Sequence, residues 1–410
     1  MVNQLIILGN GFDLSANLKT KYSDFFDYLL KEMGEVSFLE EKPKGCKSYI
    51  YRKYKYSNGK SKFKEMFNFW SGFFTTLSTT SIGKKLQWMD VEGNIKEVVT
   101  LISKNYGEYS VYQDLLNLFE EDIEPVFNNK SELMETYFKD WIHFLIEKNV
   151  KSAGDANDIL DILISDLNKF EKQFSEYLCE NVINKEISCI EDTNNRLYKR
   201  RQFLLKIVRD GFSHTPTEDT QILNFNYTPI YQRELGGDHF NLGNEIKYIH
   251  GRLEWDEEKN NFKAGSVIFG IDDTNLVNQA GNEDESLEEK LYKFGKTYRI
   301  LNSEDNTSLN LENKIDLIKF YGHSLNTADY AYFQSIFDKV DLYGSNVKLC
   351  FYYGDFEKNC DENKKKFMDR IYKLIETYGQ NTFKNNFEIR GKNLLHKLIL
   401  EGRIKTCYIK

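Results

Sequence analysis

The chain opens with an apolar run that ends abruptly in glycine, and this pattern restricts the fold. The run, Gln4 to Leu8, is followed at once by Gly9-Asn10-Gly11. A short apolar run bounded by glycines predicts a buried strand and a tight turn. The apolar residues that follow recur with the spacing of one helix face: Tyr22, Phe25, Phe26, Leu29 and Leu30. The chain therefore begins with a strand, a glycine turn and a helix.

Further apolar runs predict more strands, at residues 221–226, 246–249, 266–269, 315–321 and 347–353. Strands that alternate with helices predict a parallel sheet, whose ligands bind outside the carboxyl ends of the strands. Several runs end in a small or polar group, and these groups are the candidate site residues: Asn226, His250-Gly251, Gly270, Gly322 and Gly354.

Between residues 31 and 215 strand signals are scarce and helical signals are abundant. Residues 157–181 space their apolar side chains by three and four, which is typical of one helix in an antiparallel bundle. We therefore expect an α/β fold in which residues 1–30 and 216–410 form a Rossmann-like nucleotide-binding domain with a parallel sheet. Residues 31–215 are expected to form a mainly helical insertion domain after the first strand–helix unit.

Composition narrows the function classes. The formal net charge is −8, which disfavours a protein whose main work is to bind nucleic acid. The basic residues of 52–64, interleaved with tyrosines, leave nucleic-acid binding open, with a solvated loop as the other interpretation. No apolar run is long enough to cross a membrane.

The six cysteines are dispersed without a C-x-x-C pair, and the histidines lack the spacing of metal ligands. The start of the chain also lacks the basic flank and cleavage site of a signal peptide. We expect reduced thiols, no bound metal and a cytoplasmic protein.

The first turn has two interpretations. Glycines directly after a first strand let the backbone approach a phosphate, so Gly9, Asn10, Gly11 and Phe12 could bind a nucleotide. The spacing is G-x-G without a third glycine, and a purely structural turn is the alternative. Asp13 could bind a ribose hydroxyl or cap the turn that follows.

Three later strand ends carry groups suited to chemistry. Asn226 could hold a sugar hydroxyl or a water, or it could only form the turn before Pro229. His250 is suited to acid–base work near neutral pH, or it is a packed histidine. Gly322-His323-Ser324 lies before a predicted helix and could hold phosphate or ribose, with His323 as a second catalytic group or a turn residue.

An acidic loop supports a different chemistry. Asp272 and Asp273 follow Gly270 and could hold Mg²⁺ with Asp13 or Glu254, as in a metal-dependent nuclease. A solvated acidic loop is the other interpretation of this segment.

The opening residues 5–14 and the segment 19–25 resemble the bacterial abortive infection AbiH family. Later blocks extend the resemblance: Leu223 to Thr228, Ile249 to Gly251, Ile268 to Gly270, and Tyr321 to Leu325 with Asp329. The one departure is Ala16-Asn17, where the family often has a small residue and glycine. The resemblance implies an anti-phage role with a phage-derived trigger.

The same blocks are similar, more distantly, to sirtuin-like NAD-binding domains. The matching residues are Gly9 and Gly11, Asn226-Tyr227, His250-Gly251, and Gly322 with Ser324-Leu325. In sirtuin-like enzymes this Asn and this His are catalytic, which assigns that role to Asn226 and His250. Thr228 stands where Asp is usual, and Asn10 departs from the usual small residue. The paired-cysteine zinc module of protein deacylases is missing, so a deacylase is not expected.

These resemblances imply that NAD is a substrate rather than a cofactor. Its phosphates would lie on the Gly9–Phe12 turn and at Ser324, and Asn226 would position the ribose or the attacking water. With His250 as general base, hydrolysis would release nicotinamide and ADP-ribose, and NAD depletion would stop growth before phage release. The helical insertion would sense the trigger or form a homo-oligomer interface. A nuclease effector and a non-catalytic nucleotide-binding sensor are the alternatives.

Overall fold

The computed structural model describes most of the chain outside a few long segments. The described residues are 2–33, 68–78, 88–104, 159–187, 192–210, 217–230, 246–271, 285–302, 314–325, 329–354, 360–383 and 390–409. The chain divides into two compact units. The first comprises Met1–Thr20, Leu178–Ser266 and Ser303–Lys410, and the second comprises Lys21–Tyr177 and Val267–Asn302.

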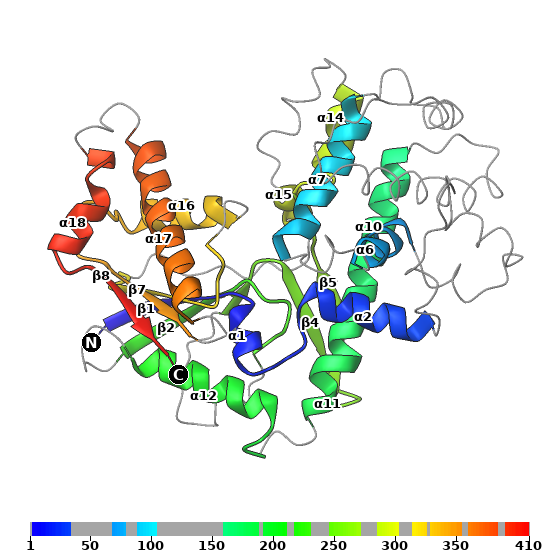
Figure 1. Cartoon of the computed structure of the whole chain (residues 1–410), viewed down its shortest axis with the longest axis horizontal. Helices are drawn as coiled ribbons and strands as arrows, with labels where there is room; N and C mark the ends of the chain where they lie inside the picture. Colours follow the sequence, from blue (N-terminus) through cyan, green and yellow to red (C-terminus); the bar gives the residue numbers. More distant parts are fainter. Residues whose placement is uncertain are drawn as a thin grey trace, which may run out of the picture. The chain divides into compact units, whose positions relative to one another are not determined.

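The first unit is built on a six-stranded sheet (Figure 1). Its strands are β1 (Val2–Leu8), β2 (Thr217–Asn224), β3 (Ile246–Tyr248), β6 (Leu317–Tyr321), β7 (Lys348–Tyr353) and β8 (Ile404–Tyr408). Every pairing is parallel, and the order is β3-β2-β1-β6-β7-β8. This order, with the first strand in the middle, is that of a doubly wound Rossmann-like fold. The predicted α/β fold with a parallel sheet is confirmed.

The strand order reverses between β1 and β6. Leu8, at the end of β1, lies beside Asn224 of β2 and Tyr321 of β6. The segments that leave β1, β2 and β6 therefore start side by side at one edge of the sheet. In open parallel sheets this reversal point is where ligands bind.

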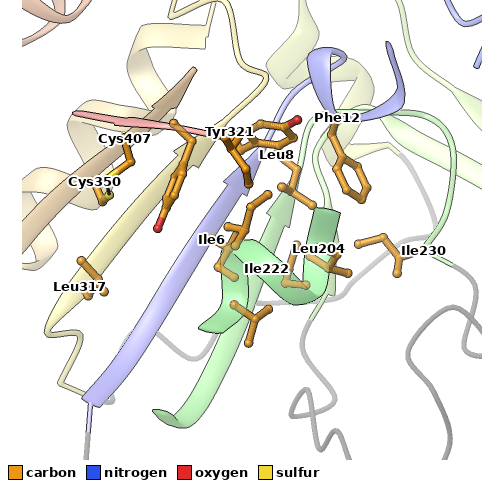
Figure 2. Packing of buried hydrophobic residues seen from close by; sticks show 14 residues of the cluster. Ile6, Leu8, Phe12, Leu204, Ile222, Ile230, Leu317, Tyr321, Cys350 and Cys407 are labelled. Atoms are coloured by element: carbon orange, nitrogen blue, oxygen red, sulfur yellow. Dashed lines mark hydrogen bonds between the residues drawn. The ribbon is translucent and has the colours of Figure 1, made fainter. Parts of the chain in front are cut away.

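One face of the sheet packs on α12 (Arg196–Arg209), as Figure 2 shows for the buried side chains. Strand side chains point alternately to the two faces, so every second residue contributes. The shared cluster includes Leu204 and Ile207 of the helix and, from the strands, Ile6, Leu8, Ile222, Leu317, Tyr321 and Cys350. The prediction assigned residues 196–209 to the helical insertion, whereas this helix lies in the same unit as the sheet.

A buried lysine joins this helix to the sheet. Lys319, in the middle of β6, donates from Nζ to the carbonyl oxygens of Ile207 at 2.7 Å, Val208 at 3.0 Å and Asp210. The last carbonyls of a helix have no partner within the helix, so the ammonium satisfies groups that burial would otherwise leave unpaired. Burial lowers the pKa of Lys319 to about 8.

The opposite face carries α16 (Tyr330–Lys339) and α17 (Cys360–Thr382), with α18 (Leu394–Leu400) leading into β8 (Figure 1). Phe320 of β6 contacts Phe333 and Phe337 of α16, with ring centroids 5.7 and 6.4 Å apart. Tyr378 of α17 packs on Phe337 in turn. The first unit is therefore a sheet between two helical layers.

Two strand predictions differ from the structure. Residues 266–269 were expected in the parallel sheet, but β4 (Gly251–Asp256) and β5 (Asn261–Val267) form a separate two-stranded sheet. The chain reverses between them because the Asp256 carboxylate accepts from the N–H groups of Glu258 and Lys259, and Asn260 adopts a φ of 50°. Strand β8 was not predicted. It is an edge strand with largely exposed side chains, so its apolar signal is weak.

The second unit is helical in its described parts. It contains α2 (Tyr22–Met33), α6 (Phe69–Ser78), α7 (Trp88–Lys104), α10 (Ile159–Tyr177), α14 (Glu285–Tyr292) and α15 (Lys296–Leu301). The helices predicted around residues 22–30 and 157–181 are confirmed, and the second continues as a π-helix over Leu178–Ile183. Its core is rich in aromatic side chains that pack on one another, including Phe25, Phe26, Phe74, Phe170, Phe174 and Phe269.

In the described part of the chain, no helix has the length and apolarity needed to cross a membrane.

Two glycines with similar backbone angles provide a matched test of how the turn after β6 is packed. Gly322 has a φ of 69° and Gly402 a φ of 62°, both in the left-handed region. An added Cβ would lie 2.4 Å from the Phe12 nitrogen at Gly322 but would have open space at Gly402. We expect Gly402→Ala to lower the free energy of unfolding by about 1–2 kcal/mol, the cost of the backbone angle. Gly322→Ala should cost about 3 kcal/mol or more, because a backbone clash is added.

Urea denaturation followed by circular dichroism measures both variants. Equal losses of stability would show that the turn after β6 is not tightly packed against the turn after β1.

Candidate functional site

The turns after β1 and β6 interlock at the reversal point of the sheet. The N–H of Gly9 donates to the Tyr321 carbonyl at 3.0 Å, and that of Gly11 donates to the Gly322 carbonyl at 2.8 Å. An added Cβ at Gly9 would lie 2.4 Å from the His323 Cα, and one at Gly11 would lie 2.6 Å from the Gly322 Cα. The close approach of the two backbones therefore accounts for all three glycines.

This packing bears on how the first turn could bind a phosphate. The N–H of Phe12 donates to the Gly9 carbonyl at 2.9 Å, so the N–H groups of Gly9, Gly11 and Phe12 all have partners within the protein. The more exposed residues of the two turns are Asn10, Gly11, Gly322 and Ser324, each half-buried. Asn10 is itself held by Thr20, whose hydroxyl donates to Oδ1 at 2.7 Å. A phosphate here would need donors other than those three N–H groups.

Asp13 belongs to a buried ion pair, an arrangement that the sequence analysis did not consider. Its Oδ1 accepts from Nη1 of Arg200 at 2.8 Å, and its Oδ2 accepts from the Thr228 hydroxyl at 2.5 Å. Burial raises the pKa of the Asp13 carboxyl, and the Arg200 charge opposes that rise. The carboxylate is thus committed to the protein rather than presented to a ribose.

Arg200 joins three segments around this carboxylate. It comes from α12, is 1% exposed, and also donates to the Pro229 carbonyl at 2.7 Å, so it connects the first turn with the loop after β2. Arg200 was not among the predicted site residues, although its position in the helix pattern could have identified it. Arg200 follows Leu197 by three residues and precedes Leu204 by four, so a charge interrupts the buried face of the helix.

The loop after β2 brings Asn226 to the reversal point. The Asn224 side-chain oxygen accepts from the N–H of Asn226 at 3.0 Å, and Nδ2 of Asn226 donates to the Gly9 carbonyl at 3.0 Å. Asn226 is 3% exposed, and its Oδ1 accepts no hydrogen bond from the described residues. A buried amide oxygen is expected to have a donor, so this atom is suited to a ligand hydroxyl or a water.

His250 and His323 share one carboxylate. Nε2 of His250 lies 3.4 Å from Oδ1 of Asp329, and Nε2 of His323 lies 3.4 Å from Oδ2 of the same group. Asp329 immediately precedes α16, and the histidines follow β3 and β6. All three side chains are more than nine-tenths buried. Each of these residues stands out in the sequence, but only the fold shows that they meet.

Aromatic rings surround the two imidazoles. The Phe225 ring meets His250 edge-on at 5.5 Å and His323 at 4.6 Å between centroids. Phe333 of α16 meets His323 at 5.0 Å. The ionisable cluster therefore lies in apolar surroundings, where electrostatic interactions are stronger than in water.

The other predicted site residues belong to the second unit, make other contacts within the first unit, or lie outside the described residues. Gly270 belongs to the second unit, where an added Cβ would lie 2.6 Å from the Lys296 Cα. Glu254 lies 3.6 Å from Lys263 in an exposed ion pair. Asp272, Asp273 and the basic residues of 52–64 lie outside the described residues. Among the residues described, no cluster of His, Cys, Asp and Glu could hold a metal ion.

Two ion pairs made by arginines of α12 provide a test of the buried Asp13–Arg200 pair. We expect Asp13→Asn to lower the free energy of unfolding by about 3–5 kcal/mol, because it leaves the Arg200 charge buried without its partner. The control is Glu186→Gln, which removes a pair of the same 2.8 Å length between Glu186 and the half-exposed Arg196. That change should cost less than about 1 kcal/mol. If urea denaturation showed only a small loss of unfolding free energy for Asp13→Asn, the expected contribution of this buried pair to stability would be wrong.

Comparison with known proteins identifies the family. Neither the curated proteins nor the solved structures contain a match to this chain. The family model described as "Bacteriophage abortive infection AbiH" matches residues 5–353, which include both glycine turns, Asn226, His250 and Asp329. The match covers well over half of the 410 residues. The chain therefore belongs to the bacteriophage abortive infection AbiH family.

Proposed function

We propose that this abortive infection protein hydrolyses NAD to nicotinamide and ADP-ribose. The observation that carries the proposal is the arrangement at the carboxyl edge of the sheet. There the buried Oδ1 of Asn226 accepts no hydrogen bond from the described residues, and Nε2 of His250 lies 3.4 Å from the Asp329 carboxylate. Both groups follow neighbouring strands of a Rossmann-like sheet, at the edge where nucleotides bind in such folds.

In this proposal NAD lies across the ends of β2, β1 and β6. Oδ1 of Asn226 accepts a hydrogen bond from a ribose hydroxyl or from the attacking water. The water oxygen forms a bond to the anomeric carbon of the nicotinamide ribose, and the glycosidic C–N bond breaks. Nicotinamide leaves with the bonding electron pair, and His250 takes the proton that the water loses.

The burial of the base suits an enzyme that would be toxic when active. His250 is 1% exposed and His323 is 7% exposed, so bulk water is kept from both rings in this state. We propose that the phage-derived trigger opens this edge to NAD, and that NAD loss then stops growth before phage release. The protein would act in the cytoplasm, where NAD is available, and a homo-oligomer is compatible with this scheme.

The activity test is release of nicotinamide from NAD by the full chain, alone and in extract of phage-infected cells. We expect His250→Ala and Asn226→Ala each to lower turnover at least about 100-fold, because they remove the base and the positioning group. His396→Ala is the matched control, since His396 is exposed on α18, and it should retain wild-type turnover. Retained activity in both site variants would overturn the assignment.

A nucleotide-binding sensor is the second candidate. The observation that favours it is that the candidate base, His250, is 1% exposed, so this state need not turn over its ligand. Recovery of an intact nucleotide from the purified chain, with no nicotinamide released under either condition, would favour the sensor over the hydrolase.

A further inference from the structure

The Asp329 carboxylate lies between the imidazoles of His250 and His323. This placement gives Asp329 and His323 a role of their own at the site. We propose that Asp329 and His323 are positioning residues that hold the neutral His250 ring with its proton on Nε2, so that Nδ1 is the basic nitrogen. The catalytic part of this inference rests on the proposed function. The protonation state itself is a property of the resting protein.

The protonation of His323 follows from its backbone contact. The N–H of Leu325 donates to Nδ1 of His323 at 2.9 Å, so this nitrogen acts as an acceptor and carries no proton. The proton of the neutral ring is therefore on Nε2, which faces Oδ2 of Asp329 at 3.4 Å. Leu325 has a φ of 56°, which is unusual for a leucine and shows that the surrounding fold holds this turn.

The same reasoning applies to His250 across the carboxylate. Its Nε2 lies 3.4 Å from Oδ1 of Asp329, and a carboxylate beside one ring nitrogen favours the proton at that nitrogen. In that tautomer Nδ1 carries the lone pair, so it is the basic nitrogen of the ring. When Nδ1 takes up a proton, the ring becomes an imidazolium cation. The nearby carboxylate stabilises this cation and so makes the ring more basic.

Asp329 is a charged contact of His250, and aromatic rings cover other parts of the imidazole. Phe225 and Tyr227, from the loop after β2, pack on the ring with centroids 5.5 and 6.0 Å away. Among the described residues, the titratable groups at the cluster include Asp329, His323 and the Tyr227 phenol. The Nε2 proton of His323 faces the other carboxylate oxygen and partly offsets its negative charge. His323 therefore limits how far Asp329 raises the pKa of His250.

This arrangement makes predictions of opposite sign for two variants. Asp329→Asn removes the negative charge, so the pKa of His250 should fall by about one unit or more. His323→Leu removes a donor from the carboxylate and makes it a stronger partner, so the pKa of His250 should rise. A merely structural role, in which either change only loosens the site, would move the pKa in the same direction in both variants.

The measurement is a pH titration of histidine ring signals by NMR on the full, histidine-labelled chain, with His250 assigned from the spectrum of His250→Gln. Asp338→Asn is the control, because Asp338 lies on the same helix and binds the Tyr378 hydroxyl instead, at 2.9 Å. The control should leave the His250 titration unchanged. An unchanged titration in Asp329→Asn, or shifts of the same sign in the two variants, would overturn the inference.

Turnover separates this inference from the proposed function. If the chain releases nicotinamide, Asp329→Asn should lower kcat at least about 100-fold with little change in KM, and it should move the acid limb of the kcat profile to lower pH. If no nicotinamide is released but the NMR shifts have opposite signs, the hydrolase proposal fails and the positioning of His250 by Asp329 stands.

Discussion

The close approach of two backbones at the middle of the sheet is the constraint on which the first unit depends. The turn after β1 donates two backbone hydrogen bonds, of 2.8 and 3.0 Å, to carbonyls at the end of β6 and in the turn after it, and at three positions only glycine allows this close approach. The contact lies where the strand order reverses, so it sets the spacing of every loop at the carboxyl edge. The buried Asp13–Arg200 pair and the Asn226 amide then fix the loop after β2 against the same turn.

The candidate site is a consequence of this packing. His250 and His323 leave strands that are not neighbours, since β2 and β1 lie between β3 and β6. They meet because Asp329, at the start of α16, reaches both rings on one face of the sheet. The polar groups that could act on a ligand are therefore held by backbone contacts and buried partners rather than by exposed loops. This is the arrangement that preorganised catalytic groups require.

Part of this organisation could be predicted from the sequence and part could not. Apolar runs that end in glycine or asparagine located β1, β2, β3, β6 and β7, because the pattern reports burial directly. The same signal failed for the exposed edge strand β8. The sequence analysis named Asn226, His250 and His323, but spacing could not show that one carboxylate joins the histidines. From the sequence, the turn at Gly9 and Gly11 could be a phosphate site or a purely structural turn. The close contact of this turn with the turn after β6 explains these glycines by packing.

The proposed hydrolysis depends on nucleotide binding at the carboxyl edge of the sheet, and this binding can be measured apart from turnover. The direct measurement is a calorimetric titration of NAD into the full-length His250→Ala chain, which keeps Asn226 and both glycine turns but should leave the ligand intact. We expect saturable binding of one NAD per chain, with competition by ADP-ribose and clear weakening when Asn226→Ala is added. No binding of NAD at millimolar concentration, with or without extract of phage-infected cells, would contradict it.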